Sequence, residues 1–129
     1  MERRVLLRNA LGIGSAGAAI AGCRQVPLQQ ELPGEFAGRG TNAARADQIR
    51  RAAAEQGWSV ETRAPGLLRA ALVRRDHQAV VDIVYDARRF TLRYAGSNNL
   101  NYDGRTISSS YNAHVQRLHR AIVAQSATV

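Results

Sequence analysis

The sequence predicts an α+β domain in two layers: a four-stranded antiparallel meander with one helix before and one after, both packed on its apolar face. Three observations support this fold class. Apolar residues alternate along four consecutive segments between residues 58 and 95, the connections between these segments are turn-length, and a helical apolar pattern flanks them on each side. The predicted domain therefore covers residues 41–129 in the order α-β-β-β-β-α.

The first helix is predicted over residues 42–56. Thr41 or Asn42 can cap its N-terminus, and Gly57 can end it in the left-handed conformation. Arg45 and the other charged residues of the segment are expected to point away from the core. The apolar stripe at spacing i, i+3, i+7 consists of Ala46, Ile49 and Ala53.

Four strands are predicted to follow, at residues 58–63, 67–74, 77–85 and 89–95. The residues between them are rich in glycine, proline, aspartate and arginine, as short turns are. The alternating residues that should face the helices are Trp58, Val60 and Thr62; Leu68, Ala70 and Leu72; Ala79, Val81, Ile83 and Tyr85; and Phe90, Leu92 and Tyr94.

Turn lengths fix the register of these strands. Two-residue turns at 75–76 and 87–88 and a three-residue turn at 64–66 place apolar residues opposite each other in every hairpin, which a register shifted by one residue would not do. The expected pairs are Leu72–Ala79, Ala70–Val81, Tyr85–Phe90, Ile83–Leu92 and Val60–Ala70. On the opposite face, the same register predicts a ladder of Arg69, Asp82 and Arg93.

A long polar loop is predicted over residues 96–109, and loops of this length in a compact domain are often functional. A second helix is predicted over residues 110–124. Its apolar face, at spacing i, i+4, i+7 and i+11, consists of Tyr111, Val115, Leu118 and Ile122.

The N-terminus has the features of an export signal. Residues 1–8 are basic, and residues 10–22 form an apolar run that is too short and too rich in glycine to span a bilayer. The run ends in Ile-Ala-Gly followed by Cys23, which resembles the lipobox of bacterial lipoproteins. We therefore expect residues 1–22 to be a signal peptide and Cys23 to be the lipidated first residue of the mature chain, anchored by several acyl chains.

Two features of this region concern the route and destination of export. Arg3 and Arg4 begin a pattern similar to a twin-arginine signal, while the Sec route fits nearly as well, so both remain open. Arg24 rather than aspartate follows the cysteine, which favours the outer membrane in a Gram-negative host. Residues 23–40 contain prolines and glycines without periodicity, and are expected to form the lipidated cysteine and a flexible tether.

The charge of the chain limits its partners. The formal net charge is +8 and every basic residue is arginine, a composition that also suits a GC-rich genome and a simply solvated surface. Nucleic acid is a common partner of basic chains, but an exported domain should not meet it. Anionic lipid, lipopolysaccharide or an acidic wall polymer is the expected counterpart. With one cysteine, the chain can form no internal disulfide.

Several segments resemble a family of small proteobacterial lipoproteins of unknown function. The matching residues are Gly57-Trp58, Pro65-Gly66, the segment from His77 to Ile83 with Tyr85, the segment from Ser97 to Gly104, and the segment from Tyr111 to Val115. The resemblance implies an envelope address and this fold, and no known activity. In that family the position of His114 is usually tryptophan and that of Ser108 is often histidine, so this chain departs from it at both.

The spacing of reactive residues assembles no catalytic or metal site, and no cofactor is expected. His114 and His119 are five residues apart on a helix, His77 and Asp82 face opposite sides of a strand, and no glycine-flanked serine is present. The best candidate surface mixes polar groups with aromatic rings in a way that suits a sugar, a peptide or a protein. It consists of Ser97, Asn99, Tyr102, Asp103, Tyr111 and Asn112. These residues can equally serve to pin the loop to the core.

Together these features predict an envelope lipoprotein, anchored in the outer membrane and facing the periplasm, that acts as a non-enzymatic binding or scaffolding module. Its expected partners are the membrane and an envelope protein or wall component. Two alternatives remain: a small periplasmic hydrolase that uses the polar loop with His77 or His114, and a binder of anionic lipid or lipopolysaccharide that uses arginines.

Overall fold

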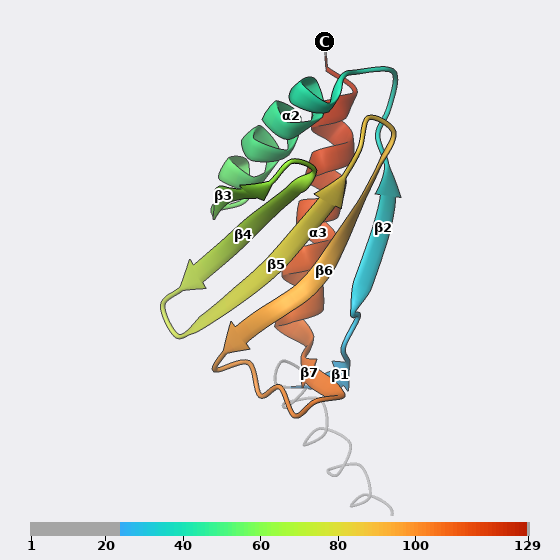
Figure 1. The fold of residues 1–129 in the computed structure, drawn as a ribbon. Helices are drawn as coiled ribbons and strands as arrows, with labels where there is room; N and C mark the ends of the chain where they lie inside the picture. The colour runs from blue at the N-terminus through green and yellow to red at the C-terminus, as the bar shows by residue number, and fades with distance from the viewer. Residues whose placement is uncertain (1–23, 129) are drawn as a thin grey trace, which may run out of the picture.

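Two helices pack on one face of an antiparallel sheet in the computed structural model, which describes residues 24–128 (Figure 1). The predicted signal peptide and the lipidation of Cys23 lie outside the described residues. The elements are β1 (Gln25–Pro27), β2 (Glu31–Glu35), α2 (Asn42–Glu55), β3 (Trp58–Ala64), β4 (Leu67–Arg74), β5 (His77–Tyr85), β6 (Arg89–Asn98), β7 (Thr106–Ser108) and α3 (Ser109–Ser126).

The main sheet has five strands in the order β2-β6-β5-β4-β3, and β1 pairs with β7 in a small second sheet. The α+β class and the meander of β3 to β6 are therefore confirmed, while three strands, β1, β2 and β7, were not predicted. The apolar faces of the sheet and of the two helices form one core between the layers. Neither helix of the described part is long and apolar enough to cross a membrane.

The predicted strand register is correct in all three hairpins. Leu72 lies opposite Ala79, Tyr85 opposite Phe90, and Val60 opposite Ala70. The turn of the first hairpin differs from the prediction, because Ala64 itself pairs with Leu67 and the strand contains a bulge between Thr62 and Ala64. The bulge takes up the extra residue, so the two-residue turn Pro65-Gly66 gives the same pairing as the expected three-residue turn.

The segment expected to be a flexible tether instead forms the edge of the main sheet. β2 pairs with β6 over its whole length, with Leu32 opposite Leu92. An edge strand tolerates Pro33 because one side of its backbone forms no ladder bonds. Gly34 is required by packing, since a Cβ atom there would overlap the ring of Phe90. The proline and glycine that suggested a linker are thus compatible with this edge strand.

The fold begins earlier still, at β1. This strand pairs with β7, with Val26 opposite Ile107. On either side of it, the Ser109 N–H donates to the Arg24 carbonyl at 2.9 Å and the Leu28 N–H donates to the Arg105 carbonyl at 2.9 Å. The fold therefore includes residues 24–28, which lie ahead of Thr41.

Both predicted helices form, but the residues that α2 buries differ from those predicted. Its N-terminus is capped by the Thr41 hydroxyl, and Gly57 follows it with a left-handed φ of 88°. The buried residues are Arg45, Gln48, Ile49, Ala52 and Ala53, at the spacing i, i+3, i+4, i+7, i+8 of a wider stripe than expected. In α3 the four apolar residues predicted for one face are all buried.

Arg45 was expected to point away from the core, and instead it is fully buried without a carboxylate partner among the described residues. Its Nε donates to the Ala87 carbonyl at 2.9 Å, Nη2 donates to the Gly38 carbonyl at 2.7 Å, and Nη1 donates to Gln48 Oε1 at 3.0 Å. Its guanidinium also lies 4.5 Å from the centre of the Phe36 ring. These contacts satisfy the buried charge by hydrogen bonds and an aromatic face.

The outer-face ladder is confirmed only in part. Arg69 Nε and Nη2 donate to the two Asp82 carboxylate oxygens at 2.8 and 3.1 Å, as expected from the register. Arg93 pairs instead with Glu31, at 3.3 Å. The edge strand β2 supplies this second carboxylate, which a four-stranded sheet would lack.

Candidate functional site

The predicted ligand-binding residues gather at one end of the domain, where the β6–β7 loop lies beside the β4–β5 turn and the β1–β7 pair (Figure 1). The loop is shorter than predicted. β6 continues to Asn98 past an irregularity opposite Val80 and Val81, so Ser97 lies in a strand. The free loop comprises residues 99–105.

Hydrogen bonds within the loop hold it in shape. Asp103 Oδ1 accepts from the backbone N–H groups of Arg105 and Thr106 at 2.9 and 2.7 Å, and Oδ2 accepts from the Thr106 hydroxyl at 2.8 Å. These hydrogen bonds to the charged form lower the pKa of Asp103 to about 2. The carboxylate is thus occupied by hydrogen bonds within its own turn. Asn99 and Asn101 supply the left-handed backbone, with φ of 60° and 57°.

Three tyrosines connect the loop to the core. The Tyr94 ring lies 4.7 Å from that of Tyr102 and 5.4 Å from that of Tyr111. Tyr111 is only 1% exposed, and burial raises the pKa of its phenol. Tyr102 remains exposed, and the Tyr94 hydroxyl bonds to the Ser97 hydroxyl at 2.8 Å. Tyr111 is therefore a core residue, whereas Tyr102 presents one ring face to solvent.

Asn112 links α3 to the N-terminal strands. Its Nδ2 donates to the Pro27 carbonyl at 3.1 Å, and its Oδ1 accepts from the Gln29 N–H at 3.4 Å. Asn99 donates its amide to the Asp76 carbonyl. Of the six residues predicted for a ligand surface, most are therefore occupied in holding the domain together, and Tyr102 is the one with an exposed aromatic ring.

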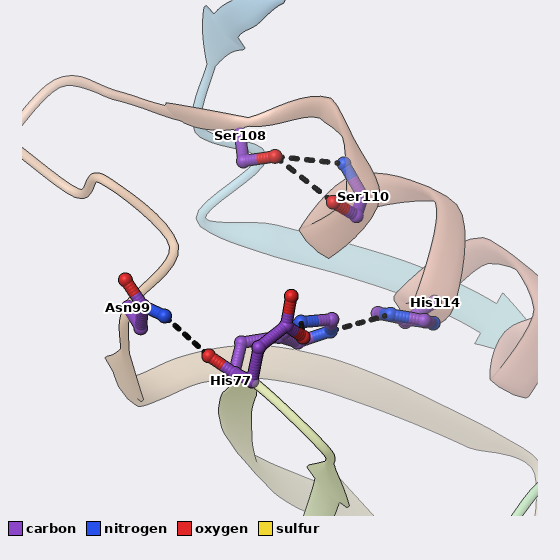
Figure 2. Close-up of polar contacts among 6 residues, drawn as sticks. His77, Asn99, Ser108, Ser110 and His114 are labelled. Carbon is purple, nitrogen blue, oxygen red and sulfur yellow. Dashed lines mark hydrogen bonds and ion pairs between the residues drawn. The ribbon is translucent and has the colours of Figure 1, made fainter. Parts of the chain in front are cut away.

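Sequence spacing missed a pair of histidines at this end (Figure 2). His77 begins β5 and His114 lies on α3, and their Nε2 atoms are 3.1 Å apart. On the far side of each ring, His77 Nδ1 lies 2.9 Å from Asp76 Oδ1 and His114 Nδ1 lies 2.7 Å from Arg117 Nη2. The sequence contains one signal for this contact. His77 and Ala79 are two residues apart on one strand, so both side chains lie on the face toward the helices.

The direction of these hydrogen bonds follows from the arginine. Because a guanidinium can only donate, His114 Nδ1 must accept from Arg117, which leaves the proton of a neutral ring on Nε2. That Nε2–H donates to His77 Nε2, and His77 Nδ1–H donates to Asp76. Desolvation, together with the nearby charges of Arg117 and Arg74, lowers the pKa of His114 to about 4. Both the geometry and the pKa thus keep His114 neutral at pH 7.

This arrangement is unsuited to the chemistry that paired histidines often perform. A metal needs a lone pair on each facing nitrogen, but His114 Nε2 carries a proton, and residues 24–128 contain no cluster of three ligands. The Nε2 of His77 is occupied by His114, so it is not free to activate a nucleophile. The nearby hydroxyls of Ser108 and Ser110 bond to each other at 2.9 Å (Figure 2). The pair therefore acts as a polar contact between β5 and α3.

The histidine pair predicts a specific pH dependence of stability. The folded-state pKa of His114, about 4, lies below the ordinary value of 6.5, so the unfolded chain binds the proton more readily. The stabilisation is therefore complete above pH 6.5 and is lost as the pH falls toward 4. Between pH 4 and pH 7.5 the free energy of unfolding should change less in His114→Gln than in the parent. Because the ring is half-buried and partly screened, we expect a difference of about 1–2 kcal/mol.

Urea unfolding between pH 4 and pH 7.5 measures this difference. His119→Gln is the matched control, since His119 bonds to the Pro33 carbonyl and packs on the ring of Phe90. That variant should keep the pH profile of the parent. Parallel profiles for the parent and His114→Gln would contradict the assignment.

A cavity of about 620 Å³ lies at the opposite end of the sheet among Phe36, Arg39, Arg88 and Arg89. No protein-family model, curated protein or solved structure matches this chain. The function is therefore argued from the residues themselves.

Proposed function

We propose that this chain is a lipid-anchored lipoprotein of the bacterial envelope, held in the outer membrane and facing the periplasm, whose domain binds or scaffolds an envelope protein or wall component. The observation that carries the proposal is the place of Arg24 in the fold. Arg24, the residue after Cys23, is already bonded to α3 through Ser109, and β1 begins at Gln25. A lipid on Cys23 would thus attach to the folded domain without a linker.

The contacts at the loop end favour a binding module over a hydrolase. The imidazole of His77 is hydrogen-bonded on both nitrogens, and the Asp103 carboxylate is used by its own turn. Catalysis requires an acid, a base or a nucleophile that can reach a substrate. Recognition requires only exposed groups on a rigid support, and a domain held together by such contacts provides that support.

Replacement of the proposed anchor residue tests the proposed location in the cell envelope. In cells, Cys23→Ser should abolish labelling by a palmitate analogue and remove the processed-size protein from the membrane fraction, because the serine hydroxyl cannot take the thioether-linked lipid. Ala127→Ser, at an exposed position, is the matched control and should remain in the membrane fraction. Cross-linking in cells then detects the bound neighbour.

Two outcomes would contradict the proposal. One is a Cys23→Ser protein that sediments with membranes at the processed size, since the anchor would then be elsewhere. The other is a wild-type protein that is lipidated but cross-links to no neighbour under any condition, which would remove the binding role.

A further inference from the structure

The exposed groups at the loop end form a compact surface, here called the loop-end surface: Arg24, Arg75, Tyr102 and Arg105. They come from three segments far apart in the sequence. Asn99 bonds to the Asp76 carbonyl and so holds the β4–β5 turn against the β6–β7 loop. Gln25 Nε2 donates to the Asn101 carbonyl at 2.8 Å, which holds the same loop against β1 (Figure 1).

The charge of this surface favours an anionic partner. Arg24, Arg75 and Arg105 are exposed, and no carboxylate among residues 24–128 forms an ion pair with them. Each of the two exposed acids of the same end already has a hydrogen-bond partner within the domain, His77 for Asp76 and the amides of its own loop for Asp103. The guanidinium groups are thus free to contact phosphate oxygens.

The attachment point fixes which side of the domain meets the membrane. Arg24 belongs to the loop-end surface and directly follows the proposed lipidated residue, so a short anchor brings this end, and not the opposite one, to the bilayer. Exposed tyrosine rings are favoured at the headgroup level because they combine an apolar ring with a polar hydroxyl. Tyr102 is 38% exposed and lies beside Arg105 in the same loop.

We propose that the loop-end surface rests on the headgroups of an anionic phospholipid bilayer, with Tyr102 inserted at the interface and the arginines bound to lipid phosphates. This inference rests on the proposed anchor. It implies that the opposite end of the domain, with the cavity near Arg39 and Arg88, points away from the membrane toward the periplasmic partner. The anchor and the surface would together fix the orientation, since a lipid anchor alone leaves rotation free.

A fluorescent reporter at each end tests the orientation in the lipidated mature protein. The chain has a single tryptophan, Trp58, which is buried, so Tyr102→Trp and Arg39→Trp each add one exposed reporter at opposite ends. The proteins are incorporated into vesicles of phosphatidylcholine with or without phosphatidylglycerol, each containing brominated lipid as a quencher. We expect quenching of the Tyr102→Trp reporter to exceed that of the Arg39→Trp reporter severalfold in the anionic vesicles.

Charge variants test the role of the arginines. On the Tyr102→Trp background, Arg75→Gln with Arg105→Gln should remove most of the additional quenching, as should 1 M salt. The matched control, Arg39→Gln with Arg88→Gln, removes the same charge from the opposite end and should leave the quenching unchanged. Free inorganic phosphate at the concentration of the lipid phosphate should also leave it unchanged, because the bilayer presents many phosphates to several arginines at once.

The outcomes separate the two proposals. Failure of the wild-type protein to float with either kind of vesicle contradicts the anchor and, with it, this inference. Flotation with equal quenching of the two reporters overturns the orientation alone and leaves the anchor standing. Equal quenching of the Tyr102→Trp reporter with and without phosphatidylglycerol, or loss of its additional quenching in free phosphate, overturns the anionic bilayer as the partner.

Discussion

Replacement of Arg45 by methionine is expected to lower the free energy of unfolding by about 2–4 kcal/mol. Methionine keeps much of the side-chain volume but donates no hydrogen bond. The carbonyls of Ala87 and Gly38 and the buried Oε1 of Gln48 would lose their donor, and an acceptor left unsatisfied in the interior costs about 1–3 kcal/mol. Methionine also removes the desolvation cost of the buried guanidinium charge, and this gain offsets part of the loss.

Urea unfolding of a chain that begins at Arg24 measures the effect. Arg51→Met on the same helix is the matched control, because Arg51 is exposed and its change should stay within about 0.5 kcal/mol of the parent. Arg45→Lys should lie between the two, since an ammonium keeps the charge but cannot reach the same set of acceptors in a fixed fork. Equal stabilities of Arg45→Met and Arg51→Met would show that the buried guanidinium is dispensable.

Removal of residues 24–40 is expected to abolish cooperative folding. This deletion takes away the edge strand β2 and the buried Phe36, and it exposes Phe90 and Leu92 on the edge of β6. Burial of one phenylalanine contributes about 3–5 kcal/mol, and whole domains are stable by only about 5–15 kcal/mol. The Gly38 carbonyl that binds Arg45 is lost as well.

Circular dichroism during thermal unfolding tests the deletion directly. A chain that begins at Arg24 should melt in one sharp transition, whereas a chain that begins at Thr41 should show a broad or absent transition and bind a hydrophobic dye. If the two chains melted at the same temperature, the N-terminal segment would be a tether after all, as the sequence alone suggests.

The part of the fold that the sequence predicts correctly is the part that local pattern determines. The strands β3 to β6 are consecutive, each alternates, and short turns allow only one register that pairs Leu72 with Ala79 and Tyr85 with Phe90. β2 is different, because its partner lies more than fifty residues away. Pro33 and Gly34 carry the local signal of a loop, and only the distant ring of Phe90 explains the glycine.

The candidate site shows the same division. Tyr111 is predicted from the sequence both for the apolar face of the second helix and for the ligand surface. Its side chain is buried on that face of α3, as the helical spacing predicts. The contact between His77 and His114 joins residues 37 positions apart. Strand alternation placed His77 toward the helices, but the position of α3 along the sheet depends on the packing of the whole domain.

The pairing of β1 with β7 has a mechanical consequence. This small sheet is three residues long, whereas β2 holds β6 over five pairs. Tension applied through Arg24 would load its hydrogen bond to Ser109 and the Gln25–Ser108 pair first, and would peel β1 away before the force reached the larger sheet. The released residues would then form a short extended segment between the point of tension and the domain, whose core would stay folded.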